Sequence, residues 1–164
     1  MSKVNKYFDK VFVINLYDNH ERWAAMQKQL KRRKIKAERF VAVDGRCKHG
    51  EKACREKLAT FELAYGVKIK VPKGSPASRF LPAASLSIGT ILLLRAMVRN
   101  GWKRMLIFED DVHFVRGFEA KFEALIKDVG DRSWDQLYLG CGGECGVRGV
   151  SAVRDRRHPY ASAW

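Results

Sequence analysis

The sequence predicts an α/β fold in which a mostly parallel sheet is flanked by helices in three layers. Short runs of large apolar residues alternate with longer segments of helical periodicity along the 164 residues, a pattern typical of parallel sheets covered on both faces. A strand, a helix and a second strand also follow one another within residues 10–43. Such βαβ units almost always cross over in one hand, which makes their strands parallel. The length fits a single domain over residues 1–164.

The first half of this unit is predicted from its apolar residues. Lys10–Leu16 reads as a buried strand, because four consecutive large apolar residues, mostly β-branched, are flanked by polar ones. A helix is predicted from about Glu21 to Arg33, and Asp18, three residues before Glu21, resembles the cap of a capping box. Lys36–Val43 supplies the second strand and ends in an Asp-Gly turn.

The middle of the chain is predicted to hold two helices separated by a loop. Glu51–Tyr65 carries its large apolar residues on one helical face, together with Cys54. Val67–Pro82 contains three prolines and a glycine, which predict a surface loop. Ala83–Asn100 is predominantly apolar and reads as a largely buried helix that ends before Gly101.

Three further elements are predicted after this helix. Met105–Phe108 is a short apolar run of the kind found in strands buried on both faces. Gly117–Val129 has an apolar stripe at helical spacing, which predicts an amphipathic helix. Trp134–Leu139 is interpreted as a fourth strand.

Three consecutive acids follow the strand Met105–Phe108, namely Glu109, Asp110 and Asp111. Parallel sheets place their chemistry at the carboxyl ends of strands, and neighbouring carboxylates repel one another unless a cation lies between them. Mg²⁺ and Mn²⁺ prefer oxygen ligands and often share them with a substrate's phosphates. The triplet is therefore a candidate site for a metal ion and a diphosphate. The alternative is that one acid caps the next helix while the others face water.

The net charge of +14 is unevenly distributed. Residues 1–57 carry 16 basic and 7 acidic side chains, residues 58–105 carry 8 and 1, and residues 106–164 carry 8 and 10. A basic surface suits a nucleotide diphosphate, an anionic acceptor or an acidic membrane surface. A nucleic acid is the rival partner, but the chain has no recognisable nucleic-acid-binding motif. A solvated basic face without a specific partner remains a further alternative.

Four cysteines are too few for a dense disulfide framework, and without a secretory signal the sequence favours reduced thiols. Cys47 with Cys54 and Cys141 with Cys145 could converge on zinc, although neither pair has the tight spacing of common zinc ribbons. The longest apolar run, Ile88–Leu94, is too short to cross a bilayer. We therefore expect a chain that is cytoplasmic or peripheral to a membrane.

Four segments occur in the order and approximate spacing of glycosyltransferase family 25. They are Val13–Leu16 followed by Arg22, then Glu38–Gly45, Ile107–Val112 and Trp134–Gly140. The chain resembles this family, which includes lipopolysaccharide and collagen galactosyltransferases, over nearly its whole length.

The resemblance implies a GT-A-like, Rossmann-type fold and a donor that is UDP-galactose or UDP-glucose. The hexose would pass to a glycan or to a protein acceptor of the hydroxylysine type. The resemblance also implies Mn²⁺ or Mg²⁺ held by a DxD-like motif, with Glu109 and Asp111 as the metal ligands. The donor-binding residues that it implies are Asn15, Leu16, Arg22, Asp44, Gly45, Ser87 and Asp110. Arg22 as a surface arginine and Asp44 as a turn former remain the alternatives.

The sequence departs from the family pattern before the long helix. Where the family commonly has a Gly-Cys-x-x-Ser-His segment, residues 83–88 keep the serine as Ser87 but have Ile88 at the histidine position. No catalytic base can be named from the sequence. We also expect the C-terminal part of the fold, which would bind the acceptor, to be shortened in this chain. The alternative to an active transferase is a catalytically inactive homologue with a binding or structural role. The sequence predicts no oligomeric state.

Overall fold

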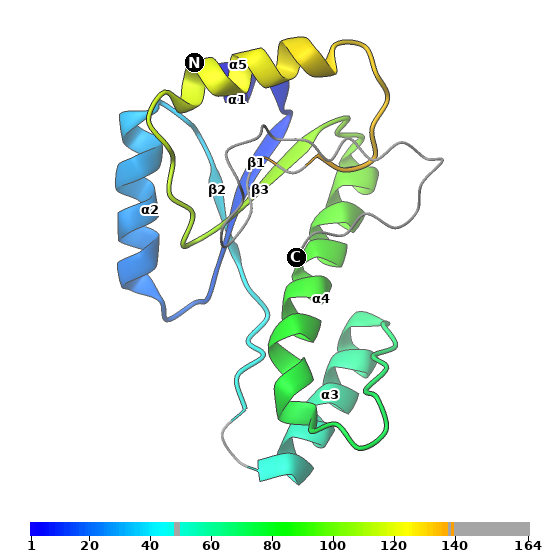
Figure 1. Cartoon of the computed structure of the whole chain (residues 1–164). Helices are drawn as coiled ribbons and strands as arrows, with labels where there is room; N and C mark the ends of the chain where they lie inside the picture. Colours follow the sequence, from blue (N-terminus) through cyan, green and yellow to red (C-terminus); the bar gives the residue numbers. More distant parts are fainter. Residues whose placement is uncertain (48–49, 138, 140–164) are drawn as a thin grey trace. The chain divides into compact units, whose positions relative to one another are not determined.

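The computed structural model describes residues 1–47, 50–137 and 139 of the chain (Figure 1). The chain divides after Phe114 into two compact units. The first unit contains the sheet and most of the helices, and the second contributes the helix α5 (Phe118–Val129). The single domain over residues 1–164 stays a prediction.

The sheet has three strands in the order β2-β1-β3, and both pairings are parallel. These strands are β1 (Lys10–Asn15), β2 (Glu38–Val41) and β3 (Met105–Glu109). β1 lies in the centre, and five of its six residues are buried, as expected for a strand covered on both faces. The observed parallel sheet flanked by helices confirms the predicted α/β, Rossmann-type fold class.

Helices cover the two faces of this sheet. On one face, Phe12 and Ile14 of β1 form a buried cluster with Leu93 of the long helix α4 (Ala77–Asn100). The alternate strand residues point to the other face, where Phe108 contacts Phe114 at a ring-centroid distance of 5.2 Å. The guanidinium of Arg33, at the end of α2 (His20–Arg32), lies over the ring of Phe114. The first unit therefore has α2, the sheet and α4 as successive layers.

α4 begins earlier than predicted, because residues 77–82 are helical and not part of a loop. The carboxylate of Glu51 accepts hydrogen bonds from the backbone N–H of Ala77 at 2.8 and 2.9 Å. Glu51 belongs to α3 (Gly50–Tyr65), which packs beside α4 in Figure 1. A cap supplied from a different helix thus starts α4, and Pro82 is accommodated inside it.

By length and composition α4 is the one described helix that could cross a membrane. Core helices of soluble proteins pass the same test. One side of α4 packs into a cluster with α3 through Leu81 and Ile88, and Leu93 packs against the sheet. Only 28% of the most apolar 18 residues of α4 are buried, however, and Leu86, Leu94 and Val98 are exposed. The prediction of a largely buried helix is therefore wrong.

Three other local predictions need correction. The N-cap of α2 is Asn19, whose side chain accepts from the backbone N–H of Arg22, and not Asp18. A short helix, α1 (Lys3–Tyr7), was not predicted. The fourth strand is wrong for residues 134–137 and 139, which form no strand, and residue 138 lies outside the described part.

The expectation of reduced thiols is wrong for Cys47 and Cys54, which form a disulfide with 7 residues of sequence separation. The bond joins the segment after β2 to the first turns of α3, where Cys54 is buried in the apolar cluster with α4. Pairing these two sulfurs also removes them as zinc ligands. Cys141 and Cys145 lie outside the described residues.

Candidate functional site

Polar side chains meet where the adjacent strands β1 and β3 end. The register pairs Ile14 with Glu109, so the residues that follow each strand emerge at the same sheet edge. Asn15 is 1% exposed, and its Nδ2 donates to Asp110 Oδ2 at 2.5 Å and to the carbonyl of Asn19 at 3.2 Å. Its Oδ1 is buried and has no hydrogen-bond partner among the described residues.

Arg22 brings a positive charge to this edge from the first turn of α2. One nitrogen, Nη1, donates to Asp110 Oδ1 at 3.1 Å and to Asp111 Oδ2 at 3.2 Å. The hydrogen bond to Asp110 is the main cause that raises the pKa of Arg22, followed by the charges of the two aspartates. We call Asn15, Arg22, Asp110 and Asp111 the strand-end cluster.

Glu109 directly precedes Asp110, and no ion pair between described residues includes it. Desolvation is the main cause that raises the pKa of Glu109, and the charges of Asp111 and Asp110 raise it further. A bound cation would reverse this effect. In the described part of the chain, no three Asp, Glu, His or Cys side chains gather closely enough to hold a metal by themselves. Mg²⁺ often takes only one or two protein carboxylates and completes its shell with phosphate oxygens and water, so a cation at this edge would need a ligand's phosphates beside the carboxylates.

The loop after β1 is held in place by its neighbours. Arg39 of β2 donates from Nη2 to the carbonyls of Leu16 and Tyr17 at 2.9 and 3.0 Å. Its guanidinium also lies over the ring of Trp23, 5.4 Å from the centroid. The backbone that leads from Asn15 to α2 is thus fixed by contacts inside the unit, which suits a preorganised binding site.

A second polar group lies between the loops that follow β1 and β2. Arg46 pairs with Asp44 at 2.7 Å and with Asp18 at 2.9 Å. Hydrogen bonds from the Arg46 side chain are the largest cause that lowers the pKa of Asp44 to about 2. This ion pair joins the two loops, although all three side chains remain substantially exposed.

Gly45 allows this loop to approach α4 closely. A Cβ at this position would lie 2.4 Å from Ser85 Oγ and 2.5 Å from the carbonyl oxygen of Leu81. Only a residue without a side chain fits such a contact. The structure therefore gives Gly45 a packing role, whereas its predicted role in donor binding stays a prediction.

The structure brings together only some of the predicted site residues. Asn15, Arg22, Asp110 and Asp111 are linked directly by the hydrogen bonds above. Leu16 is linked to the loop by its backbone carbonyl. Ser87 is exposed on α4, and no hydrogen bond described here joins it to the strand-end cluster.

Sequence reasoning missed four residues that shape these loops. They are Asp18 and Arg46 as ion-pair partners, Asn19 as a helix cap and Arg39 as a backbone clamp. Arg46 lies two residues after Asp44, a local signal that could have suggested their pairing. The hydrogen bonds from Arg39 to the carbonyls of Leu16 and Tyr17 depend on the register of β1 against β2, which cannot be read from the sequence.

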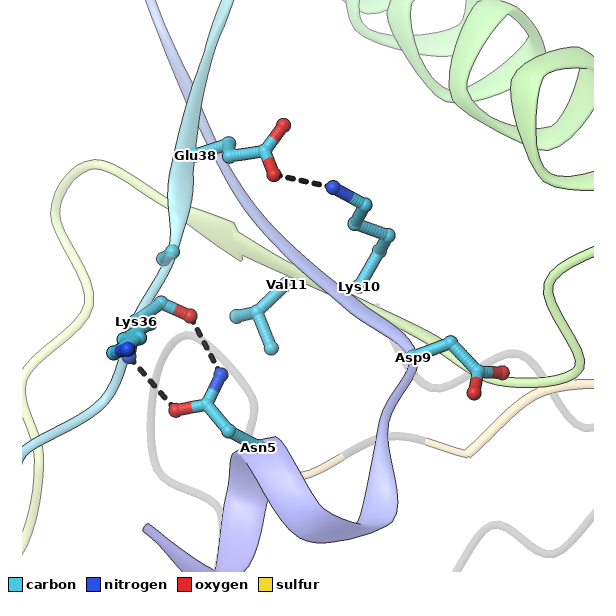
Figure 2. Close-up of a pocket in the computed structure, with 7 residues that line it drawn as sticks. Asn5, Asp9, Lys10, Val11, Lys36 and Glu38 are labelled. Carbon is cyan, nitrogen blue, oxygen red and sulfur yellow. Dashed lines mark hydrogen bonds and ion pairs between the residues drawn. The ribbon is translucent and has the colours of Figure 1, made fainter. Parts of the chain in front are cut away.

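A polar hollow of about 190 Å³ lies at the opposite end of the sheet (Figure 2). Its wall includes Lys10 and Glu38, the first residues of β1 and β2, which pair at 2.5 Å. Asn5 bonds both the backbone N–H and the carbonyl of Lys36 on another side. Figure 2 thus shows Lys10 paired with Glu38 and Asn5 with Lys36, and Asp9 accepts from the backbone N–H groups of Lys103 and Arg104. No residue of the strand-end cluster lines this hollow.

Comparison with curated proteins finds members of glycosyltransferase family 25 and procollagen galactosyltransferases. The chain is 32% identical over 138 residues to a rat protein named probable inactive glycosyltransferase 25 family member 3. It is 27% identical over 139 residues to zebrafish procollagen galactosyltransferase 1, and 27% identical over 152 residues to mouse procollagen galactosyltransferase 2.

These matches cover 81%, 81% and 85% of the chain, but only 23%, 21% and 23% of the three relatives. The chain thus spans about a fifth to a quarter of their length. No family model and no solved structure matches the chain. The matches confirm the resemblance predicted from the four sequence segments.

Proposed function

We propose that this chain, which is a homologue of glycosyltransferase 25 family members, binds the diphosphate of a nucleotide sugar at its strand-end cluster. One observation carries the proposal. Asn15, Arg22, Asp110 and Asp111 are joined by hydrogen bonds at the carboxyl edge of two adjacent parallel strands. Ligands of open α/β sheets bind at that edge.

The chemistry of each side chain suits a different part of such a ligand. The Arg22 guanidinium can bind phosphate oxygens in a bidentate manner. Asp111, together with Glu109 or Asp110, would hold Mn²⁺ or Mg²⁺ with the diphosphate. When bound, the ion would supply positive charge next to the phosphates. Asp44 can accept a hydrogen bond from a ribose hydroxyl or a uracil N–H once a ligand competes with Arg46.

In an active chain, the reaction would be the transfer of galactose or glucose from the UDP-sugar to a glycan or protein acceptor. Negative charge grows on the diphosphate as its bond to the sugar breaks, and Arg22 would stabilise that charge. Asn15 would hold Asp110 in place, which keeps the carboxylate edge fixed while the ligand binds. The chain's contribution is therefore positioning and electrostatic stabilisation.

A second candidate is a homologue that binds the donor without transferring the sugar. The names of the rat, mouse and human family members at 32% identity, which are called inactive or probable inactive, favour this possibility. It shares the donor site with the first candidate, so nucleotide binding tests both and turnover separates them.

Calorimetry with UDP, with and without Mn²⁺, tests donor binding. We expect binding that depends on Mn²⁺ and is weakened at least tenfold in Asp111→Asn, because the carboxylate that would bind the metal is lost. Asp128→Asn is the matched control, since Asp128 is an exposed acid of α5 that pairs only with Arg132 among the ion pairs described. Equal UDP affinity in both variants would refute the assigned site. Release of sugar from UDP-galactose or UDP-glucose then separates turnover from binding alone.

A further inference from the structure

We infer that the guanidinium of Arg22 and a divalent cation compete for the same carboxylate oxygens of Asp110 and Asp111. In this account Arg22 neutralises the two acids when no metal is bound, leaves them when a cation enters, and is then free to bind phosphate. The inference rests on the proposed function, because it concerns the cation and diphosphate of that site.

The first support is the position of one atom. Arg22 Nη1 lies 3.1 Å from an oxygen of Asp110 and 3.2 Å from an oxygen of Asp111. A single cationic nitrogen thus bridges two carboxylates of consecutive residues. A Mg²⁺ ion that bound the same two oxygens would lie about 2.0–2.1 Å from each of them. Two positive charges cannot occupy the space between one pair of oxygens, so one must leave.

The second support is that the Asp110 carboxylate is buried more deeply than the Arg22 guanidinium that it contacts. The Asp110 side chain is 11% exposed and accepts from Asn15, whereas the Arg22 side chain is 54% exposed. Asn15 itself is 1% exposed and is held by a second hydrogen bond to the backbone of Asn19. The Asp110 carboxylate is therefore held in place, whereas the Asp111 side chain, which is 56% exposed, and the Arg22 guanidinium can both move in solvent without disturbing the core.

The third support is the unpartnered atom at the same place. The carboxamide of Asn15 ends at Asp110, and its buried Oδ1 has no partner among the described residues. Buried polar atoms in proteins are almost always hydrogen-bonded. Asn15, the residue that holds Asp110, therefore keeps one buried acceptor oxygen that Arg22 does not satisfy, and oxygen atoms of this kind are ligands that hard cations accept.

The consequence is an ordered exchange of partners. A cation displaces Arg22 from Asp110 and Asp111, and the freed guanidinium lies within reach of a diphosphate that the cation also contacts. Cation and nucleotide would then bind cooperatively, because the ion supplies the phosphate with a second positive partner. Without the cation, the ion pair keeps Arg22 occupied and weakens nucleotide binding.

Mn²⁺ titrations without nucleotide test the competition directly. We expect Arg22→Gln to bind Mn²⁺ about three- to tenfold more tightly than the unchanged chain, as suits the loss of two exposed ion pairs, and to bind UDP more weakly. Arg32→Gln removes the same charge from the other end of α2 and should change Mn²⁺ affinity less than twofold. Unchanged or weaker Mn²⁺ binding by Arg22→Gln would overturn the inference but leave the proposed function standing. If neither protein binds Mn²⁺, both the inference and the metal site fail.

A second measurement does not depend on a variant. NMR of the Arg22 Nε–H group in the unchanged chain reports whether the guanidinium is held or mobile. We expect the addition of Mg²⁺ to increase the mobility of this group, and the later addition of UDP to restrict it again. A guanidinium that stays equally rigid when Mg²⁺ saturates the site would overturn the competition.

Discussion

Replacing Gly45 by alanine should destabilise the chain, because the added Cβ has no space. It would lie 2.4 Å from Ser85 Oγ, 2.5 Å from the carbonyl oxygen of Leu81 and 2.8 Å from its carbonyl carbon. The serine hydroxyl could rotate away, but the backbone of Leu81 belongs to α4 and cannot. Overpacking of this kind costs about 1–3 kcal/mol, and the loop that carries Asp44 would have to move away from α4.

Gly89 provides the matched control on the same helix. A Cβ there would meet only Phe40 Cε1, at 3.5 Å, an ordinary contact. Alanine in a helix interior is favoured over glycine by about 1 kcal/mol, so Gly89→Ala should be neutral or stabilising. Urea unfolding of Gly45→Ala, Gly89→Ala and the unchanged chain measures both effects. The packing argument is refuted if Gly45→Ala lies within about 0.5 kcal/mol of the unchanged chain.

Three further predictions concern the surroundings of the site. Two backbone N–H groups before β3 lower the pKa of Asp9 below 3.8, so its stabilising effect is present above that pH and is lost as the pH falls. Asp9→Asn should therefore cost about 1 kcal/mol at pH 7, because hydrogen bonds to a charged acceptor are stronger than those to a neutral one, and progressively less as the pH falls below 3.8. Urea unfolding at pH 7 and at acidic pH would show this, and an equal cost at both would contradict it. Cys47→Ala should lower the free energy of unfolding by about 2 kcal/mol, and reduction of the bond to Cys54 should match it; a smaller loss on reduction would count against the disulfide. Arg46→Gln should raise the pKa of Asp44 from about 2 toward 3.8, which carboxyl NMR would detect; an unchanged pKa would show that the ion pair does not form in solution.

The parts of the fold that were predicted correctly depend on local patterns. The apolar runs of β1 and β3 mark buried strands regardless of their partners. The parallel arrangement of the first two strands follows from the βαβ connection. That Asn15, Arg22 and the acids after Phe108 belong to one site was implied by the resemblance to glycosyltransferase family 25, and the hydrogen bonds between Asn15, Arg22, Asp110 and Asp111 agree with it.

The parts that were missed depend on contacts between distant residues. The start of α4 at Ala77 requires a carboxylate from Glu51, 26 residues earlier, which no local rule for helix caps detects. Asp18, the predicted N-cap of α2, and Asn19, the observed one, are adjacent residues with similar preference for N-cap positions. The backbone geometry at the start of the helix therefore decides between them. The disulfide between Cys47 and Cys54 likewise depends on the position of the segment after β2 relative to α3.

The occupancy of the sheet edge by Mg²⁺ and UDP tests the central claim most directly. In an NMR titration of the unchanged chain with UDP in the presence of Mg²⁺, we predict saturable changes in the side-chain amide of Asn15 and in the backbone amides of Arg22, Asp110 and Asp111. The same signals should change little when UDP is added without the metal. Saturable binding of UDP that leaves these four residues unperturbed would contradict the account, since the donor would then bind elsewhere on the chain.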